Sequence, residues 1–332
     1  MTNNEYDELI FCQMALDDGG TIAPLIIPAE ETKGAALTNP TVLVHNGEIL
    51  VNIRHLNYVL YHAEKGQHEH VWGPLTYLNP ENDVTLRTTN YICRLNPDFT
   101  IKQYLKVDTS KLDVKSLWDF IGLEDCRLMY WEDKLFLCGV RRDTTTNGVG
   151  RMELSEIELT DSSAREIKRT RMPAPGRNDS YCEKNWMPVI DKPYHWVKWT
   201  NPTEVVHFNI MTNTSTTVKL GDWDWSFKKD QRGGSQVIPF DNGYLTITHE
   251  TDLYNSERGL KNGTYRHRFI YWDKDFTMRK YSNEFTFMGA KIEFCCGMAE
   301  YGDNLLITFG FQDNAAYILQ VPKTFVYNFL YA

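Results

Sequence analysis

The stretch Gly122–Asp143, GLEDCRLMYWEDKLFLCGVRRD, decides the fold expected for this chain of 332 residues. Two adjacent carboxylates and an arginine open it, and an apolar segment, Leu128–Trp131, follows. After the acidic turn Glu132-Asp133, a second apolar segment, Leu135–Val140, leads to two more arginines. Two such segments around a short polar turn predict a β-hairpin with an apolar middle and charged ends.

The same plan recurs along the chain. Further segments place β-branched and aromatic residues on both sides of a turn rich in Asn, Asp or Gly. Together with the first they predict hairpins near residues 39–54, 124–143, 184–199, 234–250 and 294–310. A repeat of roughly fifty to eighty residues matches one four-stranded propeller blade plus its loops. We therefore expect an all-β chain, with residues 1–332 forming a single domain, a five-bladed β-propeller. A β-sandwich with accidental periodicity is the alternative.

Such a ring closes when a strand from one end of the chain completes the blade at the other end. The candidate strands for closure are Ala316–Val321 and Leu9–Cys12. Amphipathic helix patterns are nearly absent, and the one weak candidate is Ser110–Leu117.

Composition excludes several function classes. The formal net charge of −9 makes generic nucleic-acid binding unlikely, because phosphate neutralisation needs clustered Lys and Arg. The seven cysteines include no CxxC pair, so we expect no zinc site, and we expect neither another metal nor a cofactor. The first residues show no signal-peptide pattern, and no apolar run is long enough to span a bilayer, so a cytoplasmic protein is expected.

The residues that enter the predicted hairpins are unusually polar for strand starts. In a propeller the innermost strands line a central channel, so equivalent strand ends meet at one place. The entries supply carboxylates, amides and cations: Asn39, Glu124, Asp125, Arg127, Lys184, Asn185, Ser235, Gln236 and Glu293. This inventory suits a pocket that holds sugar hydroxyls and one anionic group.

Short motifs at these entries resemble a known family. Glu124-Asp125-Cys126-Arg127 is similar to a Glu-Asp-Pro-Arg-like motif of five-bladed propellers, the β-mannoside phosphorylases and related β-mannosyltransferases, with Cys126 in place of the proline. The segments Lys184–Pro188, Arg232–Gln236 and Ile292–Gly297 also resemble blade entries of such propellers. The resemblance rests on the order of short motifs and spans about residues 35–313.

The resemblance implies an inverting mechanism in which one aspartate handles the proton, and Asp125 matches that position. An acid protonates the leaving oxygen while a nucleophile attacks the opposite face of the sugar. The catalytic candidates are Asp125, Glu124 and Glu293. The substrate-binding candidates are Asn39, Arg54, Arg127, Asn185, Trp186 and Gln236. The candidates for binding phosphate or a nucleotide sugar are Arg141, Arg142, Lys184, His249 and Arg268. Because side chains alternate along a strand, we expect at most one of the adjacent arginines to face the pocket.

We therefore expect an enzyme that makes or breaks a glycosidic bond with inversion, as a glycosyltransferase or a glycoside phosphorylase, on a mannoside-like substrate. Its partners would be a glycan acceptor or oligosaccharide and either inorganic phosphate or a nucleotide sugar. One alternative is an inverting hydrolase, in which Glu293 or Glu250 activates water. Another is a non-catalytic glycan-binding propeller. The polar entries differ from repeat to repeat, which favours a single asymmetric pocket and hence an enzyme.

Overall fold

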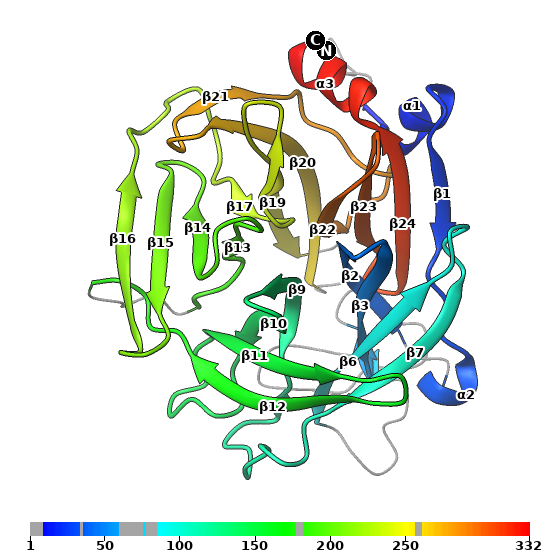
Figure 1. Cartoon of the computed structure of the whole chain (residues 1–332), viewed down its shortest axis with the longest axis vertical. Coiled ribbons are helices and arrows are strands. Elements are labelled where there is room, and N and C mark those ends of the chain that lie inside the picture. Colours follow the sequence, from blue (N-terminus) through cyan, green and yellow to red (C-terminus); the bar gives the residue numbers. More distant parts are fainter. Residues whose placement is uncertain (1–8, 34–35, 60–75, 78–84, 177–181, 256–260) are drawn as a thin grey trace.

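The structure, a computed structural model, describes residues 9–33, 36–59, 76–77, 85–176, 182–255 and 261–332. Strands dominate this part of the chain, and Figure 1 shows their sheets arranged in a ring around a common middle. No helix in the described ranges is long and apolar enough to cross a membrane.

The strand pairing divides into antiparallel meanders of four strands, and each is named below from its inner to its outer strand. The first is β2 (Ala36–His45), β3 (Glu48–Leu56), β6 (Leu86–Leu95) and β7 (Ile101–Asp108). The second is β9 (Glu124–Trp131), β10 (Lys134–Arg141), β11 (Arg151–Leu159) and β12 (Ala164–Arg171). The third is β13 (Met187–Pro188), β14 (His195–Trp199), β15 (Glu204–Asn209) and β16 (Thr214–Leu220).

In the fourth meander two short strands share the inner place, because both pair with β19. It consists of β17 (Arg232–Gly233), β18 (Ile238–Phe240), β19 (Gly243–Asn255), β20 (Lys261–Asp273) and β21 (Met278–Tyr281). The fifth is β22 (Glu293–Tyr301), β23 (Asn304–Phe311), β24 (Ala315–Pro322) and β1 (Thr21–Pro24). The remaining elements are β4 (Tyr58–Val59), β5 (Thr76–Tyr77), β8 (Phe120–Ile121), α1 (Phe11–Asp17), α2 (Ala29–Thr32) and α3 (Lys323–Tyr331).

The expected all-β, propeller-like fold is confirmed, and each predicted hairpin is an inner strand with its neighbour. The count of five blades is our interpretation of the strand pairing among the described residues. The first two meanders also join at their outer edges, where β7 and β12 pair in parallel.

Closure of the ring differs from the expectation in one strand. The predicted segment Ala316–Val321 lies in β24, but its N-terminal partner is β1, Thr21–Pro24, rather than Leu9–Cys12. Ile10 makes only an isolated bridge to Thr286, and Phe11 begins α1. The side chain of Phe11 is fully buried among aromatic rings, which favours a short helix seated on the core over an edge strand.

The weak helix candidate was also wrong. Ser110–Leu117 contains turns and bends, with no helix. The carboxylate of Asp108 accepts a hydrogen bond from the Ser110 backbone, and Thr109 donates one to Asp113. Such local side-chain bonds stabilise turns in competition with a helix.

The core fills the spaces between neighbouring sheets. Trp131 of the second meander packs edge-on against Trp196 of the third, with ring centroids 5.1 Å apart. Inner strands are buried on both faces, which explains their continuous apolar runs. At the middle of the ring, buried Gln236 donates to Val42 and Leu128 carbonyls at 2.8 and 2.9 Å and accepts from the Met298 backbone at 2.9 Å. One amide thus links four inner segments.

Candidate active site

A cavity of about 440 Å³ opens where the inner strands begin. Its described lining includes eight residues singled out from the sequence: Asn39, Arg54, Glu124, Asp125, Arg142, Lys184, Asn185 and His249. Other lining residues were not foreseen: Leu56, Tyr58, Phe120, Cys182, Arg232, Leu253, Tyr265, Ile292, Phe294 and Asp313. The polar entries of separate meanders therefore do converge in one cavity.

Three of the entry residues share an unusual backbone. Asn39, Asp125 and Asn185 have φ values of 46°, 49° and 62°, in the left-handed region. Asn and Asp are the residues other than glycine that most readily adopt it, although at some cost. The strand register shifts at the first two: between Thr38 and Thr41, where Asn39 lies, and between Cys138 and Val140, opposite Asp125. The left-handed backbone interrupts the regular alternation of side chains along the strand, and all three residues line the cavity. Strained backbone of this kind is often found at functional sites.

A carboxylate pair held by one arginine forms the acidic side of the cavity. Nη1 of Arg54 lies 2.7 Å from Oδ1 of Asp125, and Nη2 lies 3.2 Å from Oε2 of Glu124. Asn39 donates a second hydrogen bond, of 2.7 Å, to Oδ1 of Asp125. No described residue donates to Oδ2 of Asp125, which is not buried, so this oxygen is left for a ligand. Oε1 of Glu124 is buried and accepts no hydrogen bond from the described residues.

The surroundings shift the pKa values of the two carboxyl groups in opposite directions. Burial raises the pKa of Glu124 above its ordinary value, against the opposing charge of Arg54. Burial would also raise the pKa of Asp125, but the charges of Arg54 and Lys184 outweigh it and hold that pKa below its usual range. With no ligand bound, Asp125 is therefore the ionised member of the pair, and Glu124 the member that more readily keeps a proton.

Cations form another part of the cavity wall, close to the carboxylate pair. Arg142, Lys184 and Arg232 all line it, and Lys184 is exposed. Arg142 points its guanidinium over the Phe120 ring at 5.6 Å and lies 3.9 Å from the Glu124 carboxylate. These cations come from three parts of the chain that are far apart in the sequence, which suits a shared anion.

Aromatic rings form a further part of the wall. His249 is buried, and its ring stacks on Tyr265 with centroids 5.7 Å apart and planes at 10°. The ring of Phe294 packs edge-on against the His249 ring, with centroids 4.6 Å apart. Burial lowers the pKa of His249 well below its ordinary value, helped by the charges of His267 and Arg232. His249 is therefore neutral near pH 7, so it can offer a hydrogen bond but no charge to an anion.

Two predicted ligand-binding residues lie beneath the cavity instead of lining it. Arg127 is fully buried and donates to the carbonyl oxygens of Gly234, Gly233 and Asp125 at 2.8, 3.2 and 2.7 Å. It therefore fixes the backbone of Asp125, whereas Arg54 binds the carboxylate. Gln236 is the central link between the inner strands. Both support the site from below.

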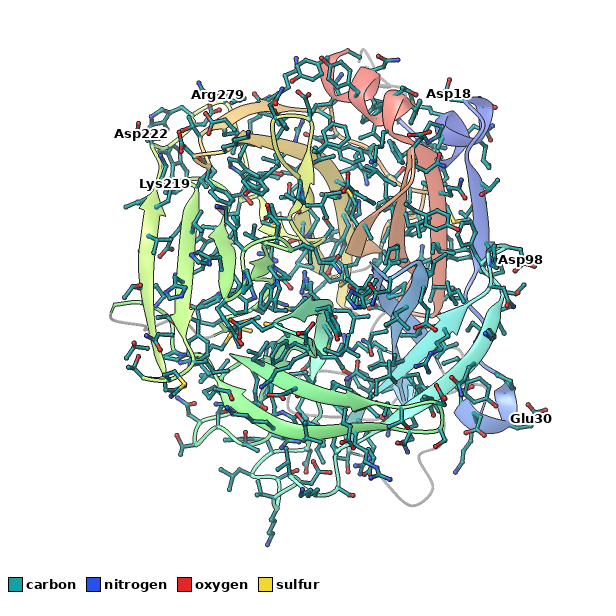
Figure 2. The ribbon with its side chains drawn as sticks, in the orientation of Figure 1. Asp18, Glu30, Asp98, Lys219, Asp222 and Arg279 are labelled. Atoms are coloured by element: carbon teal, nitrogen blue, oxygen red, sulfur yellow. The ribbon has the colours of Figure 1, made fainter. Side chains whose placement is uncertain are left out.

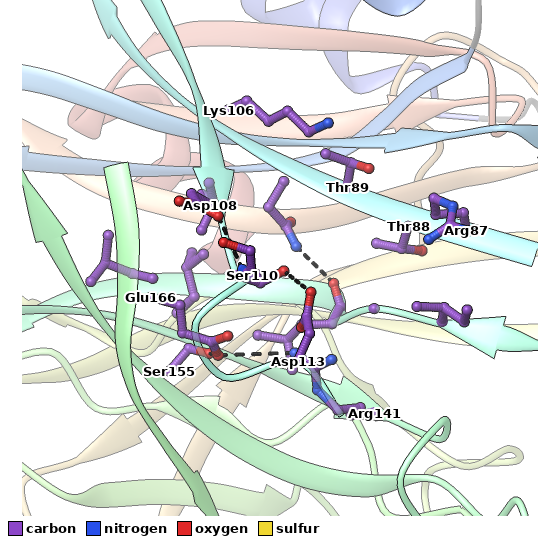
Figure 3. A pocket seen from close by; sticks show the side chains of 18 residues that line it. Arg87, Thr88, Thr89, Lys106, Asp108, Ser110, Asp113, Arg141, Ser155 and Glu166 are labelled. Carbon is purple, nitrogen blue, oxygen red and sulfur yellow. Dashed lines mark hydrogen bonds and ion pairs between the residues drawn. The ribbon is translucent and has the colours of Figure 1, made fainter. Parts of the chain in front are cut away.

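Only one of the adjacent arginines faces the cavity, as alternation predicts. The guanidinium of Arg141 is buried on the other side, with Nε 2.7 Å from Glu153 and Nη1 3.3 Å from Asp143. It lines a separate polar cavity of about 440 Å³ between the first two meanders, together with Ser155 and Glu166 (Figure 3). Because two carboxylates already neutralise it, we no longer assign Arg141 to an anion.

Three more candidates are engaged elsewhere. The carboxylate of Glu293 accepts hydrogen bonds from the backbone of Phe287, Met288 and Ala290 at 2.6, 2.8 and 3.1 Å, so it stabilises a turn. Trp186 is fully buried in the core, and Arg268 pairs with Glu284. None of the three lines the cavity.

The carboxylates expected to activate water are likewise absent from the described lining. Glu250 is buried and accepts a hydrogen bond of 3.0 Å from Gln231. Apart from the Glu124–Asp125 pair, Asp313 is the only carboxylate among the described residues that line the cavity. No group of three or more His, Cys, Asp or Glu side chains that could hold a metal is found in the described ranges.

Comparison with known proteins was made by sequence and by structure. No family model matches the chain, and no curated protein matches it in sequence. A β-1,2-mannobiose phosphorylase from Listeria innocua is similar in structure, with a TM-score of 0.56 and 14% identity over 93% of this chain and 96% of that one. A glycosyl hydrolase from Bacteroides ovatus is similar with a TM-score of 0.54 and 13% identity, over 86% of this chain and 84% of that one. A mannose phosphorylase from Leishmania mexicana, solved with phosphate, has a TM-score of 0.50 and 9% identity, over 95% of this chain and 93% of that one. The chain therefore has the fold of the solved β-mannoside phosphorylases.

Proposed function

We propose that the protein is a carbohydrate-active enzyme, and specifically an inverting glycoside phosphorylase acting on a β-mannoside. The observation that carries the proposal is a cavity lined by both a carboxylate pair and the cations Arg142, Lys184 and Arg232. An acid group opposite an anion site is what phosphorolysis of a glycosidic bond needs. The shared fold with mannoside phosphorylases supports this choice of reaction.

In the proposed reaction, one phosphate oxygen attacks the anomeric carbon from the face opposite the leaving group. The bond from that carbon to the glycosidic oxygen breaks, and the carboxyl of Asp125 gives its proton to the departing oxygen. The products are a sugar 1-phosphate of inverted configuration and the shortened acceptor. We assign the proton transfer to Asp125 because Oδ2 is free to meet a ligand, whereas Oε2 of Glu124 pairs with Arg54 and its Oε1 is buried.

The low pKa of Asp125 is compatible with this role because binding of phosphate raises it. Lys184 is one of the charges that hold this pKa down. A phosphate bound to Lys184 neutralises that charge and adds a nearby negative one, and both effects raise the pKa of Asp125. Binding of the nucleophile thus favours the protonated acid, and Glu124, which keeps a proton more readily, can supply it within the pair.

Hydrolysis is the second candidate, and one observation favours it. Asp313 lines the cavity, and a carboxylate is the kind of group that activates water in place of phosphate. The role of the cations would then differ: they would hold sugar or phosphate groups of the substrate, and water would be the nucleophile.

A panel of reactions tests the proposal. The protein is incubated with β-linked manno-oligosaccharides with and without inorganic phosphate, and separately with nucleotide sugars plus the same acceptors. We expect mannose 1-phosphate only in the phosphate reactions, formed about 10²–10⁴-fold more slowly by Asp125→Asn. Release of free mannose without phosphate would support hydrolysis, release of nucleotide would support a transferase, and no product in any reaction would refute all three.

A further inference from the structure

Two exposed tryptophans stand on the connection between β16 and β17. The side chain of Trp225 is 86% exposed and that of Trp223 is 45% exposed. Their ring centroids lie 5.8 Å apart with planes inclined by 54°. Large aromatic side chains gain stability from burial, so an adjacent pair left in water points to a binding surface.

The exposure does not result from a loose segment. The backbone of Asp224 exchanges two hydrogen bonds, both of 2.8 Å, with the side-chain amide of Asn201. The hydroxyl of Tyr281 donates a 2.7 Å hydrogen bond to Ser226, and its ring packs on Phe227 at 4.5 Å. The segment between the rings is therefore fixed on both sides, and the tryptophans are presented on a preformed support.

A third cavity is lined by these rings. It has a volume of about 540 Å³ and shares no lining residue with the candidate active site. Asp222 and Asp224 alternate with the two tryptophans in the sequence, and both line the cavity together with Lys219 from the end of β16. Figure 2 shows Lys219 and Asp222 at the outer edge of the molecule, at the end of β16. The connection continues inward from here to Arg232 in the active-site cavity.

This combination suits a neutral ligand with many hydroxyl groups. Flat aromatic faces stack against the C–H faces of a sugar ring, while carboxylate and amide groups beside them bind hydroxyls. Asp222 and Asp224 disfavour an anionic ligand. An apolar protein surface would have to desolvate both carboxylates without offering them partners, which is costly.

We propose that this cavity is a non-catalytic oligosaccharide-binding site, which holds a glycan chain at the edge of the ring away from the active site. The choice of a mannose-containing glycan as its ligand rests on the proposed function. The binding itself needs neither phosphate nor the carboxylate pair.

Affinity electrophoresis through a native gel that contains soluble mannan tests the proposal, with a mannan-free gel as reference. The wild-type protein should be retarded, and Trp225→Ala should weaken the retardation by about tenfold or more, since truncation of an aromatic anchor is among the most costly changes at a binding surface. Trp199→Ala is the matched control, because Trp199 is also exposed (44%) but lies outside this cavity. The control should be retarded like the wild type. Turnover of a disaccharide substrate by Trp225→Ala should equal that of the wild type.

Three results would overturn the site. The wild type could pass the mannan gel unretarded, or Trp225→Ala could be retarded as strongly as the wild type. Sedimentation could also show a wild-type dimer that Trp225→Ala converts to a monomer, which would assign the tryptophans to contacts between copies. Retardation that depends on Trp225, in a protein without turnover, would instead uphold the site while refuting the proposed function.

Discussion

Replacing Lys184 by Met removes one exposed cation from the candidate active site and should separate ligand binding from folding. Lys184 is exposed, and surface substitutions usually change the free energy of unfolding by about 0.5 kcal/mol or less. A hydrogen bond to a charged group contributes about 1.5–3 kcal/mol. Since about 1.4 kcal/mol corresponds to a tenfold change, the KM for phosphate should rise about 10- to 100-fold.

The same variant should change the pH profile in a direction that the structure fixes. Lys184 helps to hold the pKa of Asp125 below its usual range, so the variant should raise that pKa. An acid catalyst must be protonated, and activity is lost as pH rises through its pKa. The alkaline limb of kcat/KM, which reports the free enzyme, should therefore move to higher pH in Lys184→Met.

Steady-state kinetics at varied phosphate and pH provide the assay, and thermal unfolding checks that the variant is folded. Lys274→Met is the matched control, because Lys274 is an exposed lysine in the turn after β20 and does not line the cavity. A KM for phosphate within twofold of the wild type, with an unshifted alkaline limb, would refute the assignment of Lys184 to the anion site.

The contacts of Asp125, Gln236 and His267 lead to three further predictions. Asp125→Asn should lower kcat by about 10²–10⁴-fold with sugar affinity retained, measured by turnover and calorimetry; near-normal turnover would move the proton transfer to Glu124. Gln236→Leu should lower the free energy of unfolding by about 2–5 kcal/mol, because it leaves buried backbone groups of three inner strands without partners; urea unfolding measures this against the exposed control Gln13→Ala, and an equal loss in both variants would contradict the central role of Gln236. His267 is buried and its pKa is lowered from 6.5 to about 3, so its contribution to stability is present above pH 6.5 and is lost by about 1.4 kcal/mol per unit as pH falls toward 3; His267→Leu should flatten the dependence of unfolding free energy on pH in that window, and a slope equal to that of the wild type would count against it.

The repeat and the position of the cavity were predictable from the sequence because both depend on patterns of residue type. Polar residues such as Asn39 and Asn185 at the starts of otherwise apolar strands have no place in a core, so they point to a shared opening. The convergence of equivalent strand ends then follows from ring geometry alone. Eight of the candidate residues accordingly lie in one cavity.

The contacts inside the site were harder to predict. On a regular strand Arg127 would share a face with Asp125, two residues before it, and could bind the Asp125 carboxylate. The left-handed backbone at Asp125, with φ 49°, breaks that regularity, and Arg127 binds the carbonyl oxygen instead. The partner of the carboxylate is Arg54, from the end of β3 in the first meander.

Other differences have equally local causes. Glu293 accepts hydrogen bonds from the backbone of the turn just before it, a role that its position at a strand start did not indicate. Arg232 was quoted only as part of a motif, yet it lines the cavity because the glycines after it let the strand approach its neighbours closely: a Cβ on Gly233 would lie 1.9 Å from the carbonyl oxygen of Asn185. The glycine pair was the available signal for this close approach.

The configuration of the first product tests the central claim most directly. Proton NMR can follow the anomeric signal while a β-mannoside reacts with inorganic phosphate and the wild-type protein, with Asp125→Asn as the blank. The account predicts that α-mannose 1-phosphate appears first, in an amount equal to the acceptor released. Formation of β-mannose 1-phosphate, or of free mannose at the same rate with and without phosphate, would contradict it.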